Sequence, residues 1–227
     1  TGSKVRDNYH TILIAKNYAG VLELNKLVSI STTDSHTYYK PRISFDEFLG
    51  TSKNIIKISA CLASPLNKLP FSHKRYMELA RHYDYFEIQP HDFQEQKDFN
   101  LHLAQLSREL GKPLIAGTDT HSIDKYKAEC RSILLAAKHI EYSDEDSFDL
   151  TYKSYDELVE MFRKQNALPE SLYLEAIENT NRMADSIESF DLDLSFKYPK
   201  LYGSRDKEVF VERIKSGLET KLLSGAI

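Results

Sequence analysis

Asp119 and His121 are the two residues whose types and spacing most clearly suggest chemistry in this sequence. They follow Leu114-Ile115-Ala116, an apolar run that predicts a buried strand. Residues two apart in a strand point to the same face, so we expect the Asp119 carboxylate and the His121 imidazole to converge. Such oxygen and nitrogen donors are ligands for zinc, manganese or iron. A turn with ordinary hydrogen bonds is the alternative interpretation of this pattern.

The composition is that of a globular protein and disfavours several classes. The 227 residues suffice for one large domain or two smaller ones, with 41% hydrophobic and 28% charged residues. A net charge of −4 gives no overall basic field for nucleic acid. No apolar run approaches the roughly 18 residues that span a bilayer. Two cysteines are too few for a disulfide framework, which favours a reducing cytoplasm. Because the first residue is Thr1, we expect a piece of a longer polypeptide.

The elements that would position these residues alternate between strands and helices. Apolar runs predict strands at 11–15, 55–59, 85–88 and 114–116, and helical spacing predicts helices at 19–30, 74–82, 94–110 and 125–138. Within 94–110, Phe99, Leu103, Leu106 and Leu110 form one apolar stripe. Strands separated by helices predict a parallel sheet with right-handed crossovers. The fold class is therefore expected to be α/β.

Further candidates follow the predicted strands at their carboxyl ends, where functional residues of parallel sheets gather. Cys61 follows the second strand, Gln89 and His91 the third, and Asp119 the fourth. His10 instead precedes the first strand, so it reaches the others only if that strand is oriented differently.

Each of these candidates also has a structural interpretation. Cys61 could be a small buried hydrophobe, and Cys130 is interpreted as core packing within its helix. His91 could cap the following helix together with Asp92. The remaining histidines fall in polar loops or on helix faces and are expected to be solvated: His36, His73, His82, His102 and His139.

The character of the chain changes after Ile140. An acidic connector covers 141–152, and helical segments are predicted at 155–165, 169–187 and 206–223, with an extended linker at 197–203. We therefore expect two parts, residues 1–140 and residues 141–227.

Several stretches, read in order, resemble the PHP (polymerase and histidinol phosphatase) domain of bacterial DNA polymerase III alpha subunits, the replicative family C polymerases. Residues 10–20 resemble the motif H-x-x-L-x-A-K-N-x-x-G, residues 39–43 resemble Y-K-P-R-I, and residues 58–62 resemble L-S-A-C-L. Residues 86–96 resemble L-E-L-Q-x-H with a later Gln, and residues 117–121 match the T-N-D-x-H position. Residues 143–148 and 175–184 resemble S-D-E-D-R-F and E-A-I-x-N-T with a later I-A.

The resemblance implies part of a distorted (β/α)7 barrel followed by a mainly helical segment leading toward the polymerase palm. It implies a divalent metal site, zinc or manganese, with His10, Cys61, Asp119 and His121 as ligands and with Asp119 and His121 in catalysis. The family's other ligands, an early His-x-His, a further His and a Glu, would precede Thr1, and the palm aspartates would follow Ile227. Metal binding by these residues alone is thus expected to be weak or absent.

Two functions follow from this resemblance. The first is the PHP region of a replicative DNA polymerase, in which the site either proofreads by 3'-5' exonuclease hydrolysis or docks a separate exonuclease. Its partners would be DNA and other replisome subunits, with no membrane, and this piece alone would not transfer nucleotides. The alternative is a piece of a stand-alone PHP phosphoesterase, and a scaffold with a decayed site is a third class. Motifs at 39–43 and 175–180 favour the polymerase.

Overall fold

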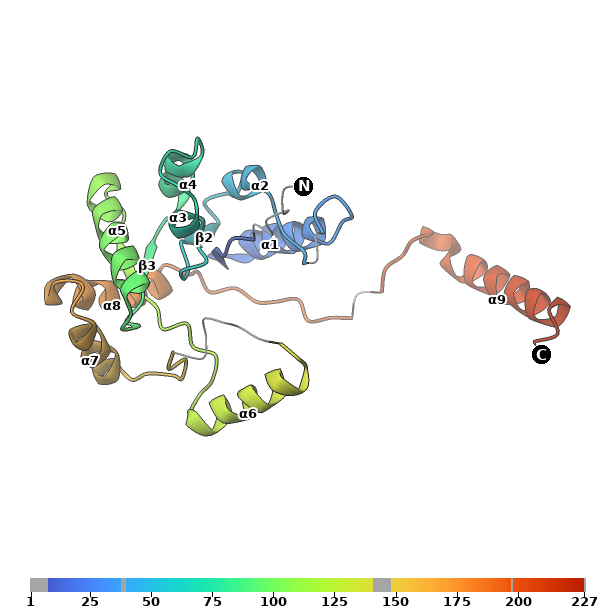
Figure 1. The fold of residues 1–227 in the computed structure, drawn as a ribbon. Coiled ribbons are helices and arrows are strands. Elements are labelled where there is room, and N and C mark those ends of the chain that lie inside the picture. Colours follow the sequence, from blue (N-terminus) through green and yellow to red (C-terminus); the bar gives the residue numbers. More distant parts are fainter. Residues whose placement is uncertain (1–7, 38–39, 141–147, 197, 227) are drawn as a thin grey trace, which may run out of the picture. The chain divides into compact units, whose positions relative to one another are not determined.

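The structure is a computed structural model that describes residues 8–37, 40–140, 148–196 and 198–226. The chain divides into two compact units, Thr1–Phe190 and Asp191–Ile227. The first contains four strands and eight helices among its described residues, and the second contains a 3-10 turn and one helix (Figure 1). Within the described residues, no helix combines the length and apolar character needed to cross a membrane.

The strands and helices lie close to where hydrophobic spacing predicts them. The strands are β1 (Ile12–Ala15), β2 (Ile55–Ile58), β3 (Phe86–Ile88) and β4 (Leu114–Ala116). The helices are α1 (Tyr18–Ser31), α2 (Phe45–Leu49), α3 (Pro65–Lys68), α4 (Tyr76–His82), α5 (Gln94–Leu110), α6 (Lys125–Ala137), α7 (Tyr155–Gln165), α8 (Glu170–Asp185) and α9 (Asp206–Leu223), with a 3-10 turn at Gly203–Arg205.

Helix α5 shows how local sequence sets these boundaries. Its apolar stripe packs into the core through Phe99, Leu103 and Leu106. The helix ends at Gly111, whose φ of 63° lies in the left-handed region that glycine adopts without steric penalty. The Gly111 N–H donates to the Ser107 carbonyl and closes the last turn.

The strands are not all parallel, and here the sequence-based expectation is wrong. β1 pairs with β2 in antiparallel register, with Ile12 opposite Ile58. β3 and β4 are parallel, with Phe86 opposite Leu114, and a single parallel bridge joins Ile58 to Tyr85. The connection from β1 to β2 contains two helices, α1 and α2, so the chain can enter β2 from the opposite end. The described strands form two two-stranded sheets and do not close a barrel.

The core of the first unit lies between the strands and the packed helices, including α7 and α8. Helix α8 covers the outer edge of β4, where the Asn179 amide donates to the Leu114 carbonyl at 2.9 Å and Thr180 donates to Ala116 at 3.5 Å. Met183 of α8 then packs among the isoleucines of β2 and β4. α8 therefore satisfies backbone groups that a further strand would otherwise pair.

The expected division at residue 140 borders residues 141–147, which lie outside the described residues. The structure's own division falls after Phe190. The division at residue 140 stays a prediction.

Two expectations about single residues are wrong. Cys130 is exposed rather than buried, because α6 buries none of its residues and does not contribute to the core. His36, His73, His82 and His102 are half-buried rather than solvated. His36 contacts Glu47, His82 contacts the Thr51 hydroxyl and His102 contacts the Tyr76 hydroxyl.

Candidate functional site

His10 and Cys61 meet because β1 and β2 are antiparallel. The start of β1 then lies beside the end of β2, and the His10 Nδ1 is 3.2 Å from the Cys61 Sγ. The His10 backbone N–H also donates to the Ala63 carbonyl at 2.9 Å, so the backbone holds this histidine against the loop after β2. The strand orientation that His10 requires is therefore present.

The loop that carries Cys61 has an unusual backbone. Ala60 is fully buried and has a φ of 61°, in the left-handed region that a residue with a Cβ rarely adopts. Such a conformation costs on the order of 1 kcal/mol and persists where surrounding contacts over-determine it. The turn redirects the chain immediately before Cys61 and is closed by the Ser64 N–H donating to the Cys61 carbonyl.

Asp119 and His121 lie near one another, although not through strand alternation. β4 ends at Ala116, and Asp119 has a φ of 49° in the loop that follows. The His121 Nδ1 is 2.7 Å from the Asp119 backbone carbonyl and 4.0 Å from its carboxylate Oδ1. Their proximity therefore arises from a turn, and the alternation argument does not apply to them.

The last residues of the acidic connector, 150–152, fix the backbone at His121. The His121 N–H donates to the Leu150 carbonyl at 2.8 Å, and the Tyr152 N–H donates to the Ser122 carbonyl at 2.9 Å. Ser122 and Thr151 form an isolated parallel bridge. Sequence reasoning missed this segment, because a single bridge has no periodic signal.

Glu87 is a buried acid beside these residues. Its burial raises the pKa of its carboxyl group, a hydrogen bond from Gln89 Nε2 at 2.8 Å acts in the opposite direction, and the charge of Asp119 raises the pKa further. Burial likewise raises the pKa of the Cys61 thiol, and the charges of Asp119 and Glu87 add to that effect. Cys61, Glu87 and Asp119 are therefore close enough for their charges to affect one another.

Gly117 leaves the space that the Glu87 carboxyl group occupies. A Cβ at position 117 would lie 2.2 Å from Glu87 Oε1, a separation that real Cβ atoms essentially never show. Gly117 is therefore required because it has no side chain, and not because it makes the loop flexible.

A buried amide network supports the chain at the end of β3. Gln165, the last residue of α7, donates to the backbone carbonyls of Gln89 at 2.9 Å and His91 at 2.7 Å. Its Oε1 accepts from Asn100 of α5 at 2.9 Å. Gln165 and Asn100 are nearly fully buried, and no motif in the sequence indicated their role.

His91 is buried next to this network and does not cap α5, whose N-cap is Phe93. Its ring stacks on Phe148 with centroids 5.0 Å apart. Among the described residues its Nε2 has no hydrogen-bond partner. Burial lowers the pKa of His91, while the charge of Asp119 acts to raise it.

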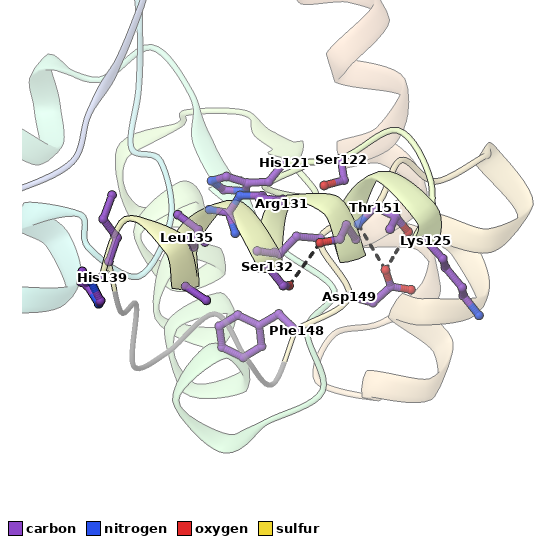
Figure 2. A pocket seen from close by; sticks show the side chains of 14 residues that line it. His121, Ser122, Lys125, Arg131, Ser132, Leu135, His139, Phe148, Asp149 and Thr151 are labelled. Atoms are coloured by element: carbon purple, nitrogen blue, oxygen red, sulfur yellow. Dashed lines mark hydrogen bonds between the residues drawn. The ribbon is translucent and has the colours of Figure 1, made fainter.

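A groove of about 620 Å³ opens beside His121 (Figure 2). One wall is α6, and the other is the segment Phe148 to Thr151. His121 therefore lines this groove and also lies beside Asp119.

The donor types suit a transition metal, but the described residues do not complete a site. Imidazole, thiolate and carboxylate are ligands that zinc accepts. His10 and Cys61 are in contact, and Asp119 lies close enough to influence the thiol. However, the described part of the chain contains no cluster of three or more His, Cys, Asp or Glu residues placed to hold a metal ion. His10, Cys61 and Asp119 therefore stay candidate ligands.

Comparison with known proteins gives a consistent family. The PHP domain model matches residues 2–93. The chain is 32% identical over 200 residues to the DNA polymerase III subunit alpha of Borreliella burgdorferi, covering 82% of this chain and 17% of that protein. It is 30% identical over 218 residues to the PolC-type DNA polymerase III of Clostridium perfringens, covering 88% of this chain and 15% of that protein.

The alpha subunit of Deinococcus radiodurans is 32% identical over 190 residues, 78% of this chain and 14% of that protein. The chain thus spans 14% to 17% of the length of these relatives. The similarity continues well beyond the residues that the PHP model covers, and the resemblance predicted from the motifs is confirmed. This chain is homologous to the PHP region of bacterial DNA polymerase III alpha and PolC-type subunits.

Proposed function

We propose that this chain serves as the PHP region of a replicative DNA polymerase and acts in DNA replication in the cytoplasm. The observation that carries the proposal is the contact between His10 and Cys61, which falls inside the residues that match the PHP model. The longer similarity to polymerase subunits, over 78% to 88% of the chain, supports the polymerase context. DNA and other replisome subunits are the proposed partners.

The four strands are proposed to be part of a distorted (β/α)7 barrel. β1 supports this proposal, because within the described residues it pairs only with β2 and its other edge is open. The side chains of β1 are only half-buried although all are apolar. An open, apolar edge of this kind is suited to a further strand.

His10, Cys61, Asp119 and His121 are proposed as part of the ligand set for zinc or manganese in a longer polypeptide. When bound, such a metal would supply Lewis-acid chemistry for phosphodiester hydrolysis, with Asp119 and His121 as the catalytic candidates. The remaining ligands would have to come from outside the described residues. A docking role for a separate exonuclease is the second possibility, and it needs no complete metal site.

The alternative is a stand-alone PHP phosphoesterase. It is less well supported, because it gives no reason for similarity to polymerase subunits beyond residue 93. The two proposals differ in substrate. A phosphoesterase acts on small phosphate esters, whereas the polymerase region alone would neither hydrolyse them nor add nucleotides to a primer.

The test is an assay of the purified chain with zinc or manganese on p-nitrophenyl phosphate and on a primed DNA template. We expect neither ester turnover nor primer extension. A second arm replaces the matching region of the Borreliella polymerase with this chain, and we expect primer extension to be retained relative to a polymerase lacking the region. Ester turnover that is lost in Cys61→Ser would favour the phosphoesterase and contradict the polymerase proposal.

A further inference from the structure

A second groove lies between helix α5 and residues 66–71, which are the end of α3 and the loop after it. We call it the α5 groove. Its volume of about 690 Å³ falls in the range of sites that take a small ligand or a few peptide side chains. The described lining comes from segments 66–71 and 95–102, and the structure describes every residue of both.

Phe71 is the exposed aromatic residue of the α5 groove, and its neighbours hold it in place. It is 70% exposed, and its ring makes edge contacts with Tyr76 and His102, with centroids 5.1 Å and 4.7 Å apart. Tyr76 is buried, and its hydroxyl donates to the Leu66 carbonyl at 3.0 Å and contacts His102 Nε2. Phe71 therefore offers an aromatic surface on a rigid support, so a ligand would not have to order it on binding.

Asp98 gives the lining of the α5 groove a negative charge that the described residues do not compensate. Its Oδ1 accepts from Gln94 Nε2 at 2.8 Å, and within the described chain no lysine or arginine forms an ion pair with it. The charges of Lys68 and Glu95 offset one another, because Lys68 Nζ lies 3.0 Å from Glu95 Oε1. Burial lowers the pKa of His102, so its ring adds no positive charge at neutral pH. The described lining therefore favours a cation and disfavours phosphate groups.

We propose that the α5 groove binds a peptide segment of a protein partner through an arginine side chain of that segment. A guanidinium group stacks on an aromatic face and donates two hydrogen bonds to a carboxylate, so Phe71 and Asp98, which line the same groove, suit arginine better than lysine. Apolar neighbours of the arginine would contact Leu69 and Pro70. The inference adds a protein-binding surface to the proposed function, and it needs neither a metal nor DNA.

The test is a titration of the nitrogen-15-labelled chain with acetyl-Leu-Arg-Leu-amide, followed by NMR at pH 7.5 and low salt. We expect the amide signals of Phe71 and Asp98 to shift, with a dissociation constant on the order of millimolar. The same peptide with citrulline, which has the shape of arginine without its charge, should bind roughly fivefold more weakly.

Substitutions within the groove should weaken binding while the fold is retained. Asp98→Asn and Phe71→Leu should each weaken it roughly threefold to fivefold, the size expected of one exposed charge pair or one exposed cation–π contact. Glu109→Gln is the matched control, because Glu109 accepts from Gln105 Nε2 at 2.7 Å in the same helix but does not line the groove. It removes the same charge and should bind as the wild type does. Unchanged signals far from the groove verify that each variant is folded.

Four results would overturn the proposal. The arginine peptide could leave the signals of the groove unchanged, the citrulline peptide could bind equally well, or Asp98→Asn and Glu109→Gln could weaken binding equally. Arginine amide alone, bound as tightly as the peptide, would identify a site for small cations instead. An oligothymidine that shifts the same signals would identify a nucleic-acid site and also contradict the proposal. Because the titration measures neither metal binding nor turnover, its failure is separate from failure of the proposed function.

Discussion

Glu87 shows how one buried side chain depends on its neighbours. Its carboxyl group lies against Gly117, accepts from Gln89 and is close to the charge of Asp119. Burial of a carboxyl group in such surroundings favours its protonated form. A cation bound nearby would act in the opposite direction and favour the ionised form.

Gly117→Ala should destabilise the first unit by roughly 1–3 kcal/mol, because the new methyl group would overlap the Glu87 carboxyl group. Urea denaturation measures the change. Gly217→Ala in α9 is the control, since a Cβ there would have no neighbour within 4 Å. Equal stability of wild type and Gly117→Ala would show that Glu87 is not packed against this glycine.

His102, which is not part of the candidate functional site, allows a test of how stability depends on pH. Its burial lowers its pKa below the usual value near 6.5, with the charge of Glu109 acting in the opposite direction. Between the usual and the lowered pKa the unfolded chain binds the proton more readily, so stability falls as pH falls through that range. Denaturation at pH 7.5 and 5.5 should show a smaller loss for His102→Gln than for the wild type. An identical loss would contradict the lowered pKa of the half-buried His102.

At the scale of elements, α7 is fastened to the end of β3 by Gln165. One amide side chain bonds two backbone carbonyls and Asn100, and these groups come from segments more than 60 residues away in sequence. Helix α8 makes a comparable connection at the edge of β4. The two helices thus hold the chain that leads into the candidate site.

Gln165→Leu keeps the approximate size of the side chain but removes three buried hydrogen bonds, to the Gln89 and His91 carbonyls and from Asn100. Each lost hydrogen bond costs about 0.5–1.5 kcal/mol, so we expect destabilisation of roughly 2–4 kcal/mol. Gln105→Leu, on the exposed face of α5 with one bond to Glu109, should change stability by less than about 0.5 kcal/mol. Similar effects of the two substitutions in urea denaturation would refute a special role for Gln165.

The helices were predictable because their apolar positions repeat and their ends carry local signals. The stripe of α5 and the stop at Gly111 are examples. The direction of β1 was not predictable, since an apolar run of four residues has the same pattern in either orientation. The sequence placed Cys61 and Asp119 at strand ends, but the left-handed turns at Ala60 and Asp119 depend on tertiary contacts.

At the scale of the whole molecule, the two units differ in how they bury apolar surface. All described hydrophobic residues that are buried lie between Phe48 and Met183, in the first unit. In the second unit, α9 leaves Phe210, Ile214 and Leu218 at least half exposed. The candidate site and the groove therefore belong to the unit that has the hydrophobic core.

Zinc titration by isothermal calorimetry tests most directly whether His10 and Cys61 belong to an incomplete metal site. Affinity depends on how many ligands are preorganised, and these residues supply one contacting pair. We predict at most one ion, bound with a dissociation constant on the order of micromolar or weaker. Its heat should disappear in Cys61→Ser and persist in Cys130→Ser, the exposed cysteine. Tight binding of two or three ions by this chain alone would contradict the account.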